Sequence, residues 1–368
     1  MNIWIRADGN EEIASGHLRR TLTIAEALRR QGGEVLFLLA DEESRDFFLQ
    51  LTDGNHAGWK YMLLGCAYGD LEGELQRMGE MMRVGVPDRL LVDSYAATPE
   101  YYERLKETAS SCRIACLDDL MAFDPPVDLV INYAPDTAAA EAFYHHAPVR
   151  LLGPQYAPLR TQFSGIKPQV RESVARILIT TGGSDPFDMA DAAAEAVRRA
   201  LPGAQDADSR TLPSGAALRR GRAASDAQDA DAGAQKPVEL VFAGPGHPYV
   251  LNMAALLAKC DLAVSAGGTT LYELCAAGVP AIAFSMAENQ RIFARKMAAA
   301  GACTYAGDVR DPKERRQVLR SITAWVRRRS GSAAGNAAAL ALRRKESARM
   351  HALTDGCGAD RIAAQLLQ

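Results

Sequence analysis

The sequence lacks several features that mark particular classes of protein. No CxxC pair occurs among its seven cysteines, which we interpret as small buried thiols in a reducing cytosol. No apolar run approaches the ~18 residues that span a bilayer, and Arg6 and Asp8 come too early for a signal peptide. The formal net charge of −3 offers no basic excess for nucleic acid or anionic lipid. We therefore expect a cytoplasmic, enzyme-like chain with neither nucleic acid nor a membrane as partner.

What the sequence does contain is an alternation of short apolar runs with helical patterns. The 368 residues suggest about two domains. In the first, strands are predicted at residues 2–7, 34–40, 89–95, 113–119 and 128–133. Between the first two strands, residues 17–30 carry an apolar stripe at helical spacing, which Gly32 and Gly33 end. Such strand–helix–strand units predict a parallel sheet with right-handed crossovers.

A second alternating series follows a break that is rich in proline and glycine. We predict a first domain at 1–160, a linker at 161–172, a second domain at 173–330 and a C-terminal helical segment at 331–368. Two doubly wound domains of this kind would place a ligand cleft between the carboxyl ends of their sheets. Residues 203–237 have almost no large apolar side chains, so we interpret them as a disordered surface insertion.

The pair Gly16–His17 stands where a loop becomes a helix. The glycine lets a ligand approach the backbone closely, and the partial positive charge of a helix N-terminus disfavours the imidazolium. His17 would then be neutral at pH 7 and able to act as a general base. A histidine that merely ends a loop is the alternative, and the pair alone does not decide between them.

Two glycine-containing loops follow strands of the second domain. Gly182, Gly183 and Ser184 form a turn with free backbone N–H groups, and the following helix points its N-terminus nearby. Residues 265–270 form a second strand-to-helix loop suited to a diphosphate. Glu273 follows on the first turn of that helix, where it can accept ribose hydroxyls or simply complement the helix dipole. Asn289 and Gln290 follow the next strand in a loop, where amides can hold sugar groups or serve turn chemistry.

Taken together, these stretches resemble a known enzyme family. In order along the chain, "RADGNEEIASGHLRRTLTIAEAL", "LLVDSY", "CLDDL", "INYAP", "LLGPQYAPLRTQF", "TTGGSDP" and "SAGGTTLYELCAAGVP…ENQ" look like the UDP-2,4-diacetamido-2,4,6-trideoxy-β-L-altropyranose hydrolases (PseG) of pseudaminic acid biosynthesis. The resemblance runs from residue 3 to about 305 and is interrupted by the insertion. Each piece alone is shared with the wider GT-B group, including the lipid-linked muramyl-peptide N-acetylglucosaminyltransferase.

The resemblance implies a GT-B fold of two Rossmann-like domains, with UDP mainly on the second domain and the sugar facing the first. It implies hydrolysis at the anomeric carbon with water as acceptor, without metal or cofactor. We expect a monomer. His17 aligns with the catalytic histidine. The implied substrate-binding residues are Arg6, Asp8, Gly16, Tyr95, Asn289 and Gln290. The implied UDP-binding residues are Gly182, Gly183, Ser184, Gly244, Ser265, Gly267, Gly268, Thr269, Thr270 and Glu273.

Three alternatives accompany this expectation. A GT-B glycosyltransferase would use the same histidine to deprotonate an acceptor hydroxyl instead of water. A non-catalytic nucleotide-sugar-binding protein would explain the two glycine loops but not the histidine. Asp118–Asp119 is the nearest candidate for a metal ligand, but its place after a predicted strand favours a structural or sugar-binding role.

Overall fold

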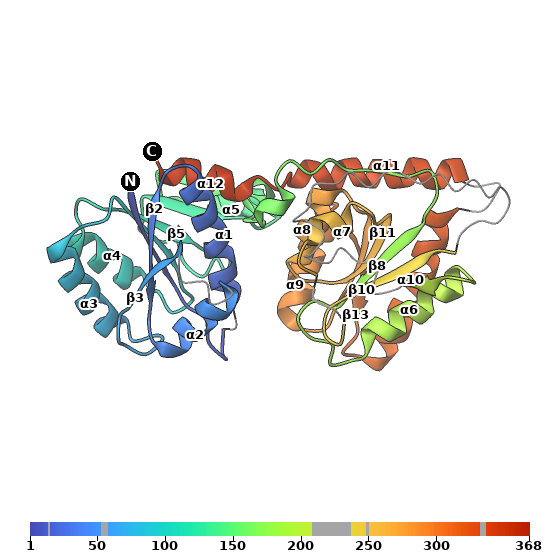
Figure 1. The fold of residues 1–368 in the computed structure, drawn as a ribbon, viewed down its shortest axis with the longest axis horizontal. Helices are drawn as coiled ribbons and strands as arrows, with labels where there is room; N and C mark the ends of the chain where they lie inside the picture. The colour runs from blue at the N-terminus through green and yellow to red at the C-terminus, as the bar shows by residue number, and fades with distance from the viewer. Residues whose placement is uncertain (14, 53–57, 208–236, 248–249, 332–335) are drawn as a thin grey trace. The chain divides into compact units, whose positions relative to one another are not determined.

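The chain forms two compact units. The structure is a computed structural model that describes residues 1–13, 15–52, 58–207, 237–247, 250–331 and 336–368 (Figure 1). Unit 1 comprises Met1–Ser164 with Gly356–Gln368, and unit 2 comprises Gly165–Asp355. From the sequence we predict one C-terminal segment at 331–368. In the structure this segment is divided after Asp355, where unit 2 ends and the chain returns to unit 1.

Unit 1 contains a seven-stranded, fully parallel sheet in the order β3-β2-β1-β4-β5-β6-β7. Its strands are β1 (Asn2–Ala7), β2 (Glu34–Leu39), β3 (Lys60–Leu63), β4 (Arg89–Asp93), β5 (Arg113–Leu117), β6 (Leu129–Asn132) and β7 (Val149–Leu152). Its helices are α1 (Gly16–Arg30), α2 (Glu42–Leu51), α3 (Leu71–Val84), α4 (Pro99–Thr108), α5 (Thr137–Phe143) and α12 (Gly358–Leu366). The five predicted strands are present, and the sheet adds β3 and β7 at its two edges.

The helices of unit 1 begin in two different ways. The side chains of Asp41, Asp70 and Thr98 accept hydrogen bonds from backbone N–H groups in the first turns of α2, α3 and α4. Ser15 stands at the same position before α1 but makes no such bond. The N-terminus of α1, which carries His17, is therefore left without a side-chain cap.

The order of the strands reverses beside β1. The chain passes from β1 outward to β2 and β3, and then returns to place β4 on the other side of β1. In open parallel sheets ligands bind outside the carboxyl ends of the strands at such a reversal. The ends of β1 and β4 are therefore the place in unit 1 where a functional site is expected.

Unit 2 contains a six-stranded parallel sheet in the order β13-β12-β11-β8-β10-β9. Its strands are β8 (Arg176–Thr180), β9 (Gln205–Asp206), β10 (Glu239–Ala243), β11 (Leu262–Ala266), β12 (Ala281–Ser285) and β13 (Thr304–Asp308). Its helices are α6 (Met189–Ala200), α7 (Met253–Leu257), α8 (Thr270–Ala277), α9 (Glu288–Ala299), α10 (Pro312–Ser330) and α11 (Asn336–Leu353). Here the order reverses between β8 and β11.

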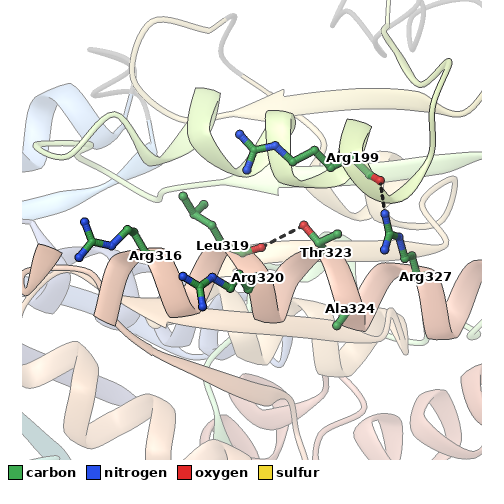
Figure 2. A pocket seen from close by; sticks show the side chains of 7 residues that line it. All are labelled: Arg199, Arg316, Leu319, Arg320, Thr323, Ala324 and Arg327. Carbon is green, nitrogen blue, oxygen red and sulfur yellow. Dashed lines mark hydrogen bonds between the residues drawn. The ribbon is translucent and has the colours of Figure 1, made fainter. Parts of the chain in front are cut away.

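Only the two ends of the predicted insertion lie within the described residues. Most of residues 203–237 lie outside the described residues, but Gln205–Asp206 form the short strand β9. Helices α6 and α10 pack together, with the Thr323 hydroxyl donating to the Ala196 carbonyl at 2.9 Å and Arg327 donating to the Arg199 carbonyl at 2.8 Å. Figure 2 shows the arginine-lined groove between them.

Within the described part of the chain, no helix combines the length and apolarity needed to cross a membrane.

The chain returns to unit 1 through its last helix, which packs against α1 (Figure 1). Arg30 of α1 pairs with Asp360 of α12 at 2.6 Å. At the start of α12 the backbone packs so closely that a Cβ on Gly358 would overlap the Ala157 carbonyl oxygen. The packing of α12 against Ala157 therefore requires glycine at position 358.

We expect Gly358→Ala to destabilise unit 1 by about 1–3 kcal/mol, the usual cost of forcing an extra methyl group into a packed site. The thermal unfolding midpoint should fall by several degrees relative to the native chain. Gly85→Ala is the matched control, because no atom lies within 4 Å of where its Cβ would stand. Equal midpoints for the two variants would contradict this account of how α12 docks.

Candidate functional site

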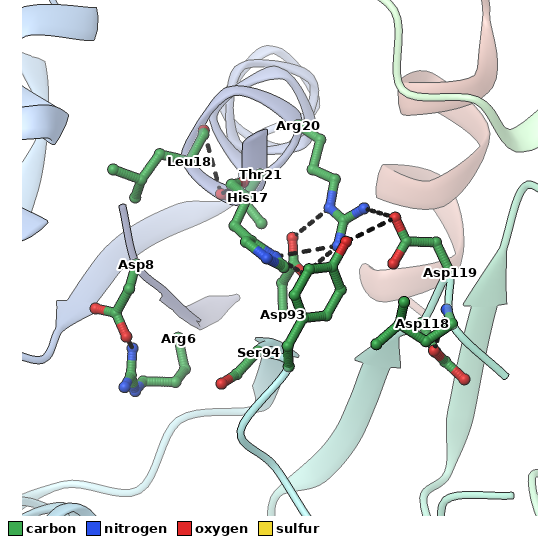
Figure 3. Close-up of polar contacts among 12 residues, drawn as sticks. Arg6, Asp8, His17, Leu18, Arg20, Thr21, Asp93, Ser94, Asp118 and Asp119 are labelled. Carbon is green, nitrogen blue, oxygen red and sulfur yellow. Dashed lines mark hydrogen bonds and ion pairs between the residues drawn. The ribbon is translucent and has the colours of Figure 1, made fainter. Parts of the chain in front are cut away.

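Four polar side chains, from α1, from β4 and from the loop after β5, meet at the carboxyl edge of the sheet of unit 1 (Figure 3). His17 lies on the first turn of α1, and Asp93 is the last residue of β4. Arg20 lies one turn further along α1, and Asp119 follows β5. This group occupies the strand reversal that the topology marks as a binding position.

The centre of the group is the pair formed by His17 and Asp93. The His17 Nδ1 atom lies 2.6 Å from Asp93 Oδ1, and the two side chains are 2% and 0% exposed. Burial alone would raise the pKa of the Asp93 carboxyl, but Arg20 and His17 lower it below its ordinary value. Because an ionised carboxylate only accepts hydrogen bonds, the shared hydrogen belongs to Nδ1. In the neutral ring, Nε2 is then the nitrogen with a free lone pair, as a general base requires.

Arg20 joins this pair to the neighbouring strands. Its Nε donates to Asp93 Oδ2 at 2.6 Å, and its Nη2 donates to Asp93 Oδ1 at 2.5 Å. Its Nη1 donates to Asp119 Oδ2 at 2.5 Å and to the Tyr133 hydroxyl at 2.9 Å. Nη2 also lies 3.1 Å from His17 Nδ1. Since both nitrogens are donors here, they share Asp93 Oδ1 rather than bonding to each other.

The structure changes the physical account of His17 that the sequence suggests. From the sequence, we attribute the neutral form of the ring to the helix N-terminus alone. In the structure the ring also has a hydrogen-bonding partner, Asp93. Sequence reasoning singles out neither Asp93 nor Arg20. The available signal was a carboxylate directly after the apolar run "RLLV", but its use required knowing that β4 lies beside β1.

Arg6 and Asp8 are each only 1% exposed. Arg6 donates to Asp8 at 2.5 Å and to Glu74 at 2.7 Å, and Asp8 accepts from the backbone N–H of Ala40 at 2.8 Å. In this structure the two side chains therefore tie β1 to α3 and to the end of β2. Their contact with substrate stays a prediction.

Tyr95 contacts the ring of His17, and Gly16 precedes His17 in the chain. The Tyr95 ring is 46% exposed and stands edge-on to the imidazole, with 4.3 Å between ring centroids. Its hydroxyl donates to Asp119 Oδ2 at 3.3 Å. No atom lies within 4 Å of the position that a Cβ on Gly16 would take, so the packing of the protein leaves open space beside this glycine. Both remain predicted substrate contacts.

Asp118 and Asp119 have separate partners. Asp118 Oδ1 accepts from the backbone N–H groups of Leu120 and Met121 at 2.8 and 3.1 Å, and its Oδ2 accepts from the Tyr144 hydroxyl at 2.7 Å. Asp118 thus holds a turn, while Asp119 belongs to the Arg20 group. Among the described residues, no three or more His, Cys, Asp or Glu side chains are grouped so as to hold a metal ion.

In unit 2 the two predicted glycine loops follow adjacent strands at the reversal of that sheet. Thr180 of β8 and Ser265 of β11 are partners in the parallel register. Gly182 adopts a positive φ of 77°, which suits glycine, and Gly244 packs with a Cβ position 3.1 Å from the Thr181 hydroxyl. The loops that carry the predicted UDP-binding residues of β8, β10 and β11 therefore lie side by side.

The loop after β11 opens directly into a helix whose N-terminus has no side-chain cap. Thr269 precedes α8 without making a capping bond. A Cβ on Gly267 would stand 2.8 Å from Ala294 Cβ and 3.0 Å from the Gln290 carbonyl, so this glycine permits close packing against α9. Gly268 and Gly183 face open space. The Gly268 N–H itself donates to the Ala266 carbonyl at 2.8 Å, so the feature that suits a phosphate group is the N-terminus of α8 without a side-chain cap beside this open space.

The loop after β8 differs from expectation in one respect. The sequence places a helix N-terminus next to Gly182–Ser184 as a further anion site. In the structure α6 begins at Met189, and Asp185 already accepts from the N–H groups of Met189 and Ala190 at 2.8 Å each. This helix start is therefore occupied by a carboxylate and would repel a second anion.

Asn289 and Gln290 form the first turn of α9 rather than a loop. Asn289 is exposed, and Gln290 Oε1 accepts from the backbone N–H of Met286 at 3.0 Å. Glu273 lies on the first turn of α8 and is half-buried. The roles of these three residues in binding stay predictions.

Comparison with known proteins agrees with this architecture. Residues 177–314 match the family model of the glycosyltransferase family 28 C-terminal domain. The structure is similar to that of MurG from Acinetobacter baumannii, with a TM-score of 0.62 and 14% identity over 100% of this chain and 99% of that chain. Together with the two parallel sheets, this likeness confirms the predicted α/β GT-B fold.

Two relatives are similar in sequence over different lengths. The spore coat polysaccharide biosynthesis protein SpsG of Bacillus subtilis is 24% identical over 313 residues, which is 83% of this chain and 84% of the relative. The UDP-N-acetylglucosamine–N-acetylmuramyl-(pentapeptide) pyrophosphoryl-undecaprenol N-acetylglucosamine transferase of Chromobacterium violaceum is 42% identical over 85 residues, which is 22% of each chain.

The two glycines after β11 should respond differently to alanine. Gly267→Ala should destabilise unit 2 by about 1–3 kcal/mol, because its methyl group meets α9. Gly268→Ala should leave the thermal midpoint unchanged and weaken UDP binding about tenfold or more, an effect of about 1.4 kcal/mol, if the loop holds the diphosphate. Thermal unfolding and calorimetric titration with UDP measure both effects. Native UDP affinity in Gly268→Ala would exclude this loop as the diphosphate site.

Proposed function

We propose that the protein hydrolyses a UDP-linked 2,4-diacetamido-2,4,6-trideoxy hexose at its anomeric carbon, releasing UDP and the free sugar for pseudaminic acid biosynthesis. The observation that carries the proposal is the buried pair of His17 and Asp93, with 2.6 Å between Nδ1 and Oδ1. This pair leaves Nε2 as the proton acceptor at the strand reversal. The resemblance of the motifs to the hydrolase family supplies the substrate class.

In the proposed reaction, His17 Nε2 accepts a proton from a water molecule as its oxygen attacks the anomeric carbon. The bond from that carbon to the diphosphate oxygen breaks, and its electron pair leaves with UDP. The imidazolium that forms is stabilised by the ionised Asp93, which remains unprotonated. General-base assistance of this kind contributes about 10²–10⁴-fold to the rate.

The leaving group is assigned to unit 2. Negative charge grows on the diphosphate as the bond breaks, and the N-terminus of α8, which lacks a side-chain cap, offers neutral donors to it, while Gly268 leaves room for its approach. Glu273, on the first turn of the same helix, is assigned to the ribose hydroxyls. The match of residues 177–314 to the glycosyltransferase family 28 C-terminal domain supports a nucleotide-sugar ligand on this unit.

A glycosyltransferase is the second candidate. The 42% identity to the Chromobacterium violaceum transferase over 85 residues favours it. His17 would then deprotonate a hydroxyl of an acceptor, and the rest of the site would serve either reaction. The two candidates therefore differ only in whether water is sufficient as the acceptor.

Incubation of the native protein with the diacetamido UDP-sugar and no acceptor separates these candidates. We expect one UDP and one free sugar for each molecule of substrate consumed, with NMR spectroscopy identifying the sugar and its anomeric configuration. If UDP appears only after an acceptor alcohol is added, the protein is a transferase.

The base assignment predicts the effect of two substitutions. His17→Ala removes the base, and Asp93→Asn allows the ring to adopt the other tautomer, so each should lower kcat by about 10²–10⁴-fold. UDP affinity should change little, because the UDP loops lie in unit 2. Asp46→Asn, at an exposed acid on α2, is the matched control. Near-native turnover in His17→Ala would show that His17 is not the base.

A further inference from the structure

We infer that Arg20 is a positioning residue that sets the orientation of His17 by fixing Asp93. This inference rests on the proposed function, because it assigns a role within the same site. Arg20 does not donate to the imidazole. It acts on the carboxylate to which the imidazole donates.

The geometry of the carboxylate carries the first step. Asp93 is 0% exposed, so both of its oxygens need partners from the protein. Arg20 supplies Nε to Oδ2 and Nη2 to Oδ1, at 2.6 and 2.5 Å, and these two parallel bonds fix the plane of the carboxylate. His17 Nδ1 donates to the same Oδ1. Without Arg20 the carboxylate could turn about its own axis, and the imidazole would turn with it.

The second step concerns the surroundings of the ring. The Nη1 atom of Arg20 holds Asp119 Oδ2, which also accepts from the hydroxyl of Tyr95. Tyr95 in turn stands edge-on to His17 at 4.3 Å. Arg20 therefore governs the imidazole along two routes, one through Asp93 and one through Asp119 and Tyr95.

Lysine could not replace this residue. A guanidinium carries five N–H groups in one plane, and here they serve Asp93 twice, Asp119 and Tyr133. An ammonium has three donors on a single atom and cannot reach both oxygens of Asp93 in parallel while also holding Asp119. The specific need is therefore the planar shape of the group as well as its charge.

The test uses Arg20→Ala and Arg20→Lys in the full chain, with Arg19→Ala as the control. Arg19 is an exposed neighbour on the same helix. We expect Arg20→Ala to lower kcat by about 10²-fold, as misplacement of a reacting group by about 1 Å can do, with KM within about threefold of native. Arg20→Lys should be similarly impaired. Added guanidinium ion, at millimolar concentrations well below those that unfold proteins, should restore at least part of kcat in Arg20→Ala and not in His17→Ala.

NMR spectroscopy of nitrogen-labelled His17 supplies a readout that does not require turnover. In the native protein we expect a hydrogen-bonded proton on Nδ1. Arg20→Ala should lose or broaden that signal, and guanidinium should return it. A native signal in Arg20→Ala, kcat within about threefold of native, or a loss of kcat that guanidinium does not rescue would each overturn the inference. If the native protein releases no UDP while the Nδ1 signal depends on Arg20, the proposed function fails and the positioning role stands.

Discussion

The burial of the Asp93 carboxylate is the constraint on which the site of unit 1 depends. A carboxylate with 0% exposure must be matched by positive charge and hydrogen bonds. Arg20 provides the charge, and Arg20 and His17 both donate hydrogen bonds. The orientation of the imidazole thus follows from the need to compensate a buried charge at the carboxyl edge of the sheet. Asp119 adds a second carboxylate to one guanidinium, so the three groups together carry one excess negative charge beside the ring. That excess suits the proposed uptake of a proton by the ring.

The strand reversals of the two units present different kinds of polar group. In unit 1 the reversal beside β1 presents ionisable side chains, whereas in unit 2 the reversal beside β8 presents glycines and backbone N–H groups. Side chains can gain or lose protons, while backbone donors keep a constant polarity that suits a phosphate at any neutral pH. The Asp185 carboxylate, in the loop after β8, is turned toward its own helix. The two strand reversals therefore differ in the kind of atom that each presents.

The elements that could be predicted are those whose side chains are buried on both faces of a sheet. Strands such as β4 and β11 read as unbroken apolar runs, while β3, β7 and β13 are edge strands with exposed residues and give no such signal. His17 and the glycine loops could be found because each lies within a local motif. Asp93 and Arg20 could not be paired, since they are 73 residues apart and meet only through the order of the strands. The cap by Asp185 was missed for a related reason, because its carboxylate turns back onto a helix that starts later than the glycine loop suggests.

The docking of α12 against α1 has a consequence for how the chain is made. The first unit contains the first 164 residues and also residues 356–368, so its final helix is synthesised only after the whole of unit 2. Domains generally fold in the order of their synthesis, yet here the earlier unit must wait with the surface that α12 covers exposed to solvent. During that interval the nascent protein carries an open apolar seam beside Gly33, where Leu367 packs in the finished fold. All of unit 2 is thus synthesised before unit 1 can close.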